Sequence, residues 1–125
     1  MSVSVSVMLA VPDCAAAVAW YREGLGATVL WDLGSVAGLS IAGAPFFLHE
    51  PVEGRFVAPS AAGFVTARVE LFCHDPEAVI AKAAAAGAVG KDVQTHDAPW
   101  GPHRQGGFID PFGHVWHVGD RSPLG

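Results

Sequence analysis

Basic residues, cysteines and long apolar runs are all scarce in this chain of 125 residues. The seven lysines and arginines are scattered and the net charge is −5, which argues against a nucleic-acid partner because phosphate binding needs clustered basic side chains. No apolar run approaches the roughly 20 residues of a membrane-spanning helix, so no membrane partner is expected. Two cysteines, Cys14 and Cys73, are too few for a disulfide framework and lack metal-site spacing. We therefore expect reduced thiols in a cytoplasmic protein.

Apolar residues are plentiful, at 51% of the chain against 15% for charged residues. This balance suits a packed core and not a disordered chain, and the length suits one domain over residues 1–125. The first residues, MSVSVSVMLAV, alternate polar and apolar side chains and lack the basic stretch that opens a signal peptide. They predict a strand over residues 2–11, with its valines and Leu9 on one apolar face.

The same order of elements is predicted twice along the chain. Asp13 and Gly26 suit the start and the end of a helix over residues 14–23, and Asp75 with Gly87 does the same for a helix over 77–86. Strands are expected over 27–33, 36–42 and 45–50, then, after a stretch rich in proline and glycine at 51–63, over 65–73 and near 93–96, 106–109 and 114–119. The result is an α+β fold of two βαβββ modules, at about 1–51 and 64–121, whose curled mixed sheets surround a cup.

Two motifs resemble those of a known superfamily. The stretch Val11-Pro12-Asp13…Trp20-Tyr21-Arg22…Leu25-Gly26-Ala27 is similar to the first strand–helix unit of vicinal oxygen chelate proteins, which include glyoxalase I, extradiol dioxygenases, fosfomycin-resistance enzymes and bleomycin-resistance proteins. The stretch Trp100-Gly101…Arg104…Gly106…Asp110-Pro111-Phe112-Gly113-His114-Val115-Trp116 resembles the closing hairpin of their glyoxalase-like bacterial branch. The resemblance implies the glyoxalase-like fold, a small-molecule ligand and a homodimer, with domain swapping between subunits as an alternative.

The motif Asp110-Pro111-Phe112-Gly113 also has a physical interpretation of its own. Proline at the second position and glycine at the fourth suit a type I turn, in which the Asp110 side chain accepts from turn amides. We expect it to shape a hairpin and to carry no chemistry.

Superfamily enzymes hold a divalent metal with one residue from each of four strands, and the resemblance places these positions at Ser6, Phe47, Arg68 and His117. Phenylalanine and arginine cannot act as ligands here and serine is a poor one, so we expect no metal and no other cofactor. An alternative register places His49, Glu70 and His117 on one face, which would suit Fe, Zn, Ni or Mn. Against it, Arg68 shares that face and can pair with Glu70.

The predicted ligand-binding residues share the inner face of the cup or its rim. On the face, alternation places Ser6, Met8, Phe47, His49, Arg68, Glu70, Phe72, Val115 and His117. Trp31, Phe56 and Trp100 are expected to add flat surfaces near the rim. Met8 and Phe72 can instead fill the core, residues 51–63 can form a lid or strap, and His96 and His103 are expected in an exposed loop.

Three functions remain open from these residues. The first is a metal-free protein that binds an aromatic or polycyclic, antibiotic-like molecule, giving resistance by sequestration as bleomycin-resistance proteins do. The alternative is a metal-dependent enzyme of the glyoxalase or dioxygenase type that uses His49, Glu70 and His117. The third is a metal-free enzyme with Glu70 or His117 as general base. No catalytic residue is assigned, because no nucleophile–base pair stands at a familiar spacing.

Overall fold

The computed structural model describes residues 2–124 and repeats one arrangement of elements. The first module holds β1 (Met8–Ala10), α1 (Cys14–Leu25), β2 (Thr28–Asp32), β3 (Val36–Ile41) and β4 (Ala44–His49). A short helix, α2 (Pro59–Ala62), lies in the connection. The second module holds β5 (Val69–Phe72), α3 (Pro76–Ala85), β6 (Val89–Ala98), β7 (Gly101–Ile109) and β8 (Val115–Gly119).

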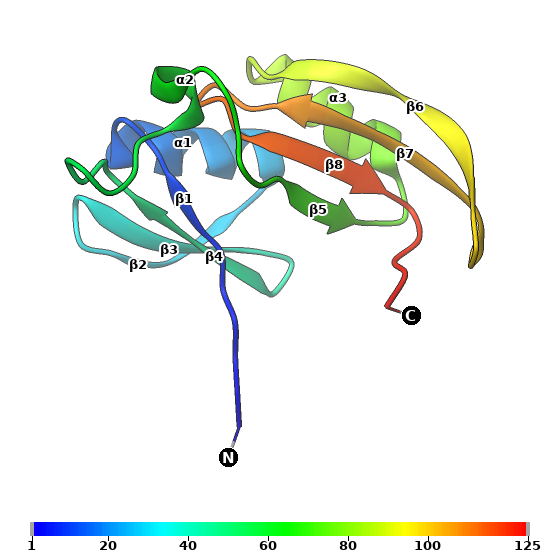
Figure 1. The fold of residues 1–125 in the computed structure, drawn as a ribbon, viewed down its shortest axis with the longest axis horizontal. Coiled ribbons are helices and arrows are strands. Elements are labelled where there is room, and N and C mark those ends of the chain that lie inside the picture. The colour runs from blue at the N-terminus through cyan, green and yellow to red at the C-terminus, as the bar shows by residue number, and fades with distance from the viewer. Residues whose placement is uncertain (1, 125) are drawn as a thin grey trace.

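Each module forms its own four-stranded mixed sheet. The strand orders are β1-β4-β3-β2 and β5-β8-β7-β6, and in each sheet the edge strand that begins the module runs parallel to its last strand. Figure 1 shows the two sheets as separate, curled layers, neither closed into a barrel. The predicted α+β fold of two βαβββ modules is confirmed.

Both long helices begin and end within two residues of the predicted bounds. The Asp13 carboxylate accepts from the Ala16 amide at 3.0 Å, and α1 ends at Gly26, which adopts the left-handed φ of 65° that glycine tolerates best. The Asp75 carboxylate accepts from the Ala78 amide at 3.1 Å in the same way, with Pro76 opening α3. Local capping therefore positions the repeated helices.

A single buried cluster runs through both modules. Helix α1 packs on β3 and β4, α3 packs on β6, β7 and β8, and the two helices also contact each other. Tyr21 of α1 lies 5.3 Å from Phe46 of its own module and 5.9 Å from Trp116 of the other, between ring centroids. The Trp20 indole N–H donates to the Ala86 carbonyl at the end of α3, at 2.9 Å. The helix-facing side of each sheet is therefore core, and the opposite side is left open.

The strand predicted over residues 2–11 is mostly wrong. Only Met8–Ala10 pair as a strand, and residues 2–7 form an extended N-terminal arm that leaves the body of the molecule (Figure 1). Leu9 and Val11 are buried as expected, but Val3 and Val5 are 82% and 87% exposed. An alternating sequence forms a strand only where a partner strand runs beside it. The Val7 carbonyl accepts from the Phe47 amide at 2.8 Å, and on the N-terminal side of Val7 β4 no longer runs beside the chain.

The segment around His96 and His103 is a hairpin and not the expected loop. β6 and β7 are longer than predicted and place these two histidines opposite each other, with ring centroids 5.7 Å apart. Pro99 and Trp100 make the turn between Ala98 and Gly101, so the breakers that suggested a loop occupy only the tip. The strand expected over 65–73 begins only at Val69.

Candidate functional site

The side of the first sheet that faces away from α1 is aromatic. We call it the first open face; it carries Met8, Trp31, Phe47 and His49. The Trp31 and Phe47 rings lie 5.4 Å apart, and the His49 ring meets the edge of Phe56 at 5.4 Å. The Nδ1 atom of His49 lies 2.6 Å from the Glu50 carbonyl oxygen. This surface offers flat apolar area with little free hydrogen-bonding capacity.

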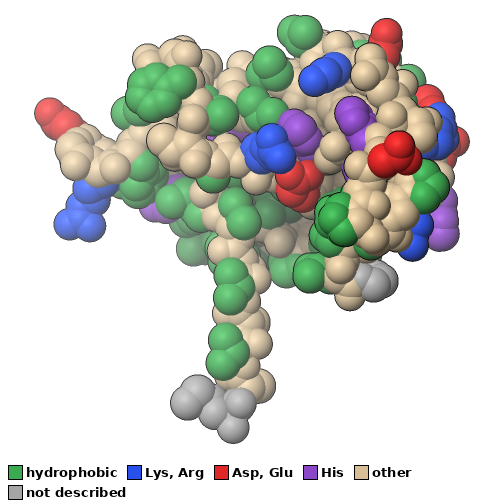
Figure 2. Space-filling view, turned by 45° about the vertical axis from the view of Figure 1, so that its right-hand side comes forward, with side chains coloured by type: hydrophobic (Ala, Val, Ile, Leu, Met, Phe, Trp, Pro, Cys, Tyr) green, Lys and Arg blue, Asp and Glu red, His purple; other side chains and the backbone are tan. Residues whose placement is uncertain are grey.

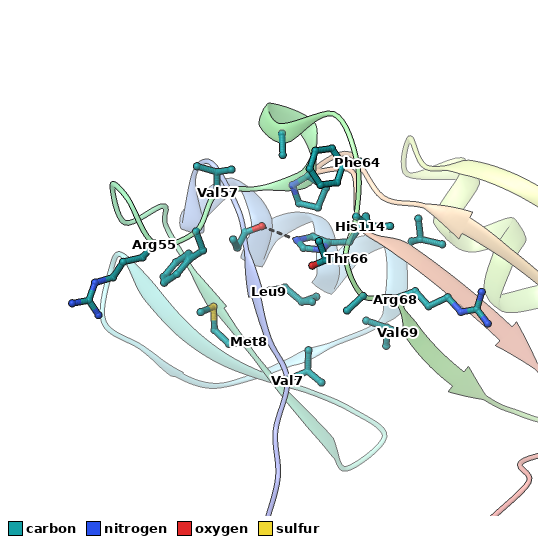
Figure 3. A pocket seen from close by; sticks show the side chains of 17 residues that line it. Val7, Met8, Leu9, Arg55, Val57, Phe64, Thr66, Arg68, Val69 and His114 are labelled. Carbon is teal, nitrogen blue, oxygen red and sulfur yellow. Dashed lines mark hydrogen bonds between the residues drawn. The ribbon is translucent and has the colours of Figure 1, made fainter.

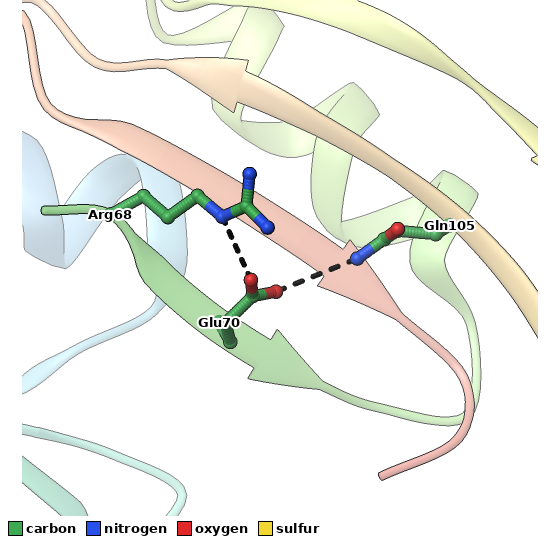
Figure 4. Close-up of polar contacts among 3 residues, drawn as sticks. All are labelled: Arg68, Glu70 and Gln105. Carbon is green, nitrogen blue, oxygen red and sulfur yellow. Dashed lines mark hydrogen bonds and ion pairs between the residues drawn. The ribbon is translucent and has the colours of Figure 1, made fainter. Parts of the chain in front are cut away.

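The side of the second sheet that faces away from α3 is polar. We call it the second open face; it carries Arg68, Glu70, Gln105 and His117. Figure 4 shows Arg68 donating through Nε to Glu70 at 2.9 Å, while the Gln105 amide donates to the other carboxylate oxygen at 3.5 Å. The pairing of Arg68 with Glu70, expected from their shared strand face, is confirmed. Figure 2 shows histidine, basic and acidic side chains gathered around a hollow on the molecular surface.

Burial lowers the pKa of the His117 imidazole below its ordinary value of 6.5, and the charge of Arg68 lowers it further. Glu70 opposes this shift and Lys91 adds to it. The ring is therefore held neutral near pH 7. Its Nδ1 atom is buried without a hydrogen-bond partner within the described residues, as is that of His103.

Three hollows border these faces. A groove of about 410 Å³ lies between the edges of β1 and β5, under the segment 55–67, and brings together Met8, Phe56 and Arg68 (Figure 3). A second hollow, of about 470 Å³, is lined by Arg68, Glu70, Trp100 and the chain near Leu124. A smaller one, of about 120 Å³, is lined by His117, His96 and Gln105.

Apart from Met8, Phe56 and Arg68, which line one groove together, the structure divides the predicted ligand-binding residues into two groups. Trp31, Phe47 and His49 lie on the first open face, and Glu70, Trp100 and His117 border the second; Ser6 lies in the exposed N-terminal arm. None of the hollows described above contains both Phe47 and His117. Met8 and Phe72 are each 40% exposed, so the alternative in which they fill the core is wrong.

The strand register shows which of the four positions predicted for metal ligands lie beside a partner strand. The parallel ladders pair Phe47 with Met8 and His117 with Glu70, whereas Ser6 and Arg68 lie before the paired strands β1 and β5. Met8 and Phe47 offer no oxygen or nitrogen donor, and Glu70 is already bound by Arg68. Within residues 2–124, no group of three or more His, Cys, Asp or Glu side chains is close enough to hold a metal. The alternative set His49, Glu70 and His117 is therefore not assembled within one described chain.

The motif around Asp110 is structural, as its sequence indicates. The Asp110 carboxylate is 3% exposed and accepts from the amides of Phe112 and His114 at 2.9 and 3.0 Å. It also accepts from the Trp116 indole at 3.0 Å and from the Tyr21 hydroxyl. All its acceptor capacity serves the fold, which leaves none for a ligand.

Sequence reasoning missed Gln105 and Gly38. Gln105 shares a face with His103 and Gly107 along β7, so its position follows from period-2 alternation once the strand is extended to Gly101. Gly38 lies beneath Trp31 in the middle of β3. A lone glycine inside a strand pattern is a signal of close approach that was available in the sequence.

Comparison with known proteins gives consistent results. The family described as "Glyoxalase-like domain" matches residues 6–119. TioX from Micromonospora sp. ML1 is 26% identical, with a TM-score of 0.74 over 97% of this chain and 100% of that one. An Arabidopsis thaliana gene product is 23% identical, with a TM-score of 0.73 over 96% and 100% of the two chains.

The fosfomycin resistance protein FosX of Listeria monocytogenes, solved with Mn(II) and a dihydroxypropylphosphonic acid, is 15% identical, with a TM-score of 0.72 over 98% of this chain and 93% of that one. At this identity the likeness concerns the fold. No curated protein sequence matched. No helix within residues 2–124 has the length and hydropathy to cross a bilayer.

Proposed function

Because this chain belongs to the glyoxalase-like family of the vicinal oxygen chelate superfamily, we propose that it is a metal-free protein that binds an aromatic or polycyclic small molecule in a cup shared by two subunits. The observation that carries the proposal is the separation of the two open faces. One is aromatic and the other polar, yet they lie on different sheets of one chain. A ligand site of apolar walls and a few directed polar groups needs both.

A homodimer in which each subunit contributes one open face completes such a cup. In it, the first open face of one subunit lies opposite the second open face of its partner. Large apolar side chains exposed on both faces support this arrangement, since Trp31 is 38% exposed and Phe72 40%. The unpaired edges of β1 and β5 and the exposed valines of the N-terminal arm give further surface for a second copy.

The donor set supports binding without a metal. Of the four positions that the resemblance gives for metal ligands, Ser6 lies in the exposed arm, and Phe47 and Arg68 offer no donor that suits a metal. Glu70, which pairs with His117 across the strands, already accepts a hydrogen bond from Arg68. A cation there would have to displace the Arg68 guanidinium from the carboxylate. Sequestration of an antibiotic-like molecule is the role that suits an aromatic wall with no reactive centre.

Tryptophan fluorescence tests the binding function. Trp20 and Trp116 are 8% and 2% exposed, so quenching by a panel of aromatic antibiotics reports mainly Trp31 and Trp100. We expect saturable quenching by at least one compound. Both Trp31→Phe, followed through the fluorescence of Trp100, and His117→Ala should raise the dissociation constant, although the two residues lie on different faces. Glu23→Gln, on the exposed side of α1, is the control. Absence of saturable quenching across the panel contradicts the proposal.

Elemental analysis tests the metal-free part. Protein purified without added metal is expected to carry less than stoichiometric metal. A stoichiometric metal that is lost in His117→Ala contradicts this part and favours a glyoxalase- or dioxygenase-type enzyme.

A further inference from the structure

An irregularity in β2 turns Trp31 onto the first open face. The β2–β3 ladder pairs Val29 with Leu39 and then Trp31 with Gly38, so Leu30 is an extra residue. Without it, Trp31 would stand opposite Ala37, which is fully buried on the core side. Bulges of this kind re-aim a side chain and are over-represented beside active sites. The bulge thus takes a large indole out of the core and places it on the open side of the sheet.

Gly38 provides the surface on which this indole rests. A Cβ atom on Gly38 would lie 2.4 Å from both Cε2 and Nε1 of Trp31, a separation that no real side chain adopts. The indole therefore lies directly against the backbone of β3. A glycine inside a strand often marks such a close approach, at a cost to the strand itself.

These residues form one row across the sheet. Trp31, Gly38, Phe47 and Met8 pair in sequence from β2 to β1, and the Phe47 ring is tilted by 49° against Trp31. The side of the indole that carries Nε1, Cε2 and Cζ2 lies against Gly38, and Trp31 remains 38% exposed. A bulge and a strand glycine, both unfavourable to the sheet, hold the indole against the strand backbone without burying it. Such an arrangement suits a flat partner.

We propose that Gly38 is a positioning residue that, together with the Leu30 bulge, holds Trp31 flat as the stacking surface for a planar aromatic ring of the ligand. This inference rests on the proposed function and narrows its ligand class to molecules with a fused planar ring. Aromatic rings stacked on or packed edge-to-face against Trp31 and Phe47 gain about 0.5–1.5 kcal/mol beyond burial, a gain that a saturated ring of the same size lacks.

The test compares two probes of equal size and charge, naphthalene-2-carboxylate and its decahydro analogue, by isothermal titration calorimetry. In the wild type, the aromatic probe should bind more tightly. Gly38→Ala should weaken the aromatic probe by about 2- to 10-fold, the range that corresponds to the stacking gain, and leave the saturated probe nearly unchanged. Gly90→Ala is the matched control, because Gly90 lies in β6 against Ile80 and Ala84, away from both open faces.

A double-mutant cycle separates positioning from a general structural effect. If Gly38 acts through the indole, Gly38→Ala adds nothing to the loss already caused by Trp31→Ala. An equal loss in both backgrounds overturns the inference. Should Gly38→Ala fail to fold, Trp31→Leu takes its place, since it removes only an exposed ring, and it must abolish the preference for the aromatic probe.

The failures are distinguishable. Equal affinity for both probes, or aromatic affinity unchanged by Trp31→Ala, overturns the stacking surface and leaves the small-molecule function standing. Binding of neither probe, together with no quenching by the antibiotic panel, overturns both.

Discussion

Asp110 links the two modules through hydrogen bonds from Tyr21 in α1 and Trp116 in β8. Burial and the adjacent carboxylate raise the pKa of the Tyr21 hydroxyl well above its ordinary value, so the phenol remains a donor at any working pH. When a buried carboxylate loses one hydrogen-bond donor, part of its desolvation penalty is no longer compensated, and the folded state is destabilised.

We therefore expect Tyr21→Phe to lower the free energy of unfolding by about 1–3 kcal/mol. The ring and its packing remain, so the loss reports the hydrogen bond. Urea denaturation at pH 7 measures it. Thr28→Val, which removes a longer, 3.4 Å bond to the Ser40 carbonyl from an exposed residue, should change stability by less than about 0.5 kcal/mol. Equal losses of unfolding free energy in the two variants would show that the hydrogen bond to Asp110 contributes no more to stability than an exposed one.

His117 should titrate below 6.5, and Arg68→Gln should raise its pKa because a nearby positive charge is removed and Glu70 is released. Because the wild-type folded chain lowers the pKa of His117, its unfolded chain binds more protons than the folded chain just below pH 6.5. The contribution of His117 to stability is accordingly complete above that pH and is lost as the pH falls through the folded-state pKa. NMR titration of the imidazole signals measures the shift. Arg104→Gln, which removes a guanidinium paired with Glu77, should leave the His117 pKa unchanged.

Single residues were predictable where the cause is local. The turn role of Asp110 and the Arg68–Glu70 pair depend on neighbours within four positions, and both were found. The side of the sheet on which Trp31 lies depends on an extra residue in β2, and this bulge becomes apparent only from the pairing of β2 with β3. Alternation along β2 alone cannot reveal it, so the contact of Trp31 with Gly38 was missed even though a glycine inside the predicted strand was visible in the sequence.

At the scale of elements, the helices followed from their caps, whereas the strands depended on burial. β6 (Val89–Ala98) has almost no buried position and many polar residues, so it lacks the apolar alternation that marks a half-buried strand. Its pairing with β7 comes from a long hairpin, which is a tertiary feature. The strand predicted over residues 2–11 failed for the opposite reason, because its pattern was strong and its partner was absent from the described chain.

The turn between β7 and β8 should be sensitive to any side chain at Gly113. Its φ is +89°, and a Cβ there would lie 2.6 Å from the Ser60 amide nitrogen in α2. Gly43 also has a φ of +89° but has nothing within 4 Å. Gly43→Ala should therefore lower the free energy of unfolding by about 1–2 kcal/mol, the strain of an alanine in the left-handed region. Gly113→Ala should lower it by clearly more, because the added Cβ also clashes with α2. Chemical denaturation of both variants measures the difference. Equal costs would mean that α2 moves aside freely.

For the whole molecule, the N-terminal arm extends away from the body (Figure 2), and its Val3 and Val5 are 82% and 87% exposed. If two copies assemble through the open strand edges, removing residues 2–7 should weaken the dimer, and Val3→Ser with Val5→Ser should do so less, because the backbone donors and acceptors remain. Sedimentation at several concentrations measures the change. A wild-type chain that stays monomeric at all concentrations would leave the two open faces without a partner and contradict the shared cup.

The separation of the aromatic and polar faces within one chain has a genetic consequence. A chain damaged only at Trp31 and a chain damaged only at His117 are each unable to build a sound cup with a copy of themselves. Mixed by unfolding and refolding together, they form hybrid pairs in which one cup receives both damaged walls and the other receives neither. Two inactive proteins would then complement each other and regain about a quarter of the normal sites, as two defective alleles would in a cell that expresses both.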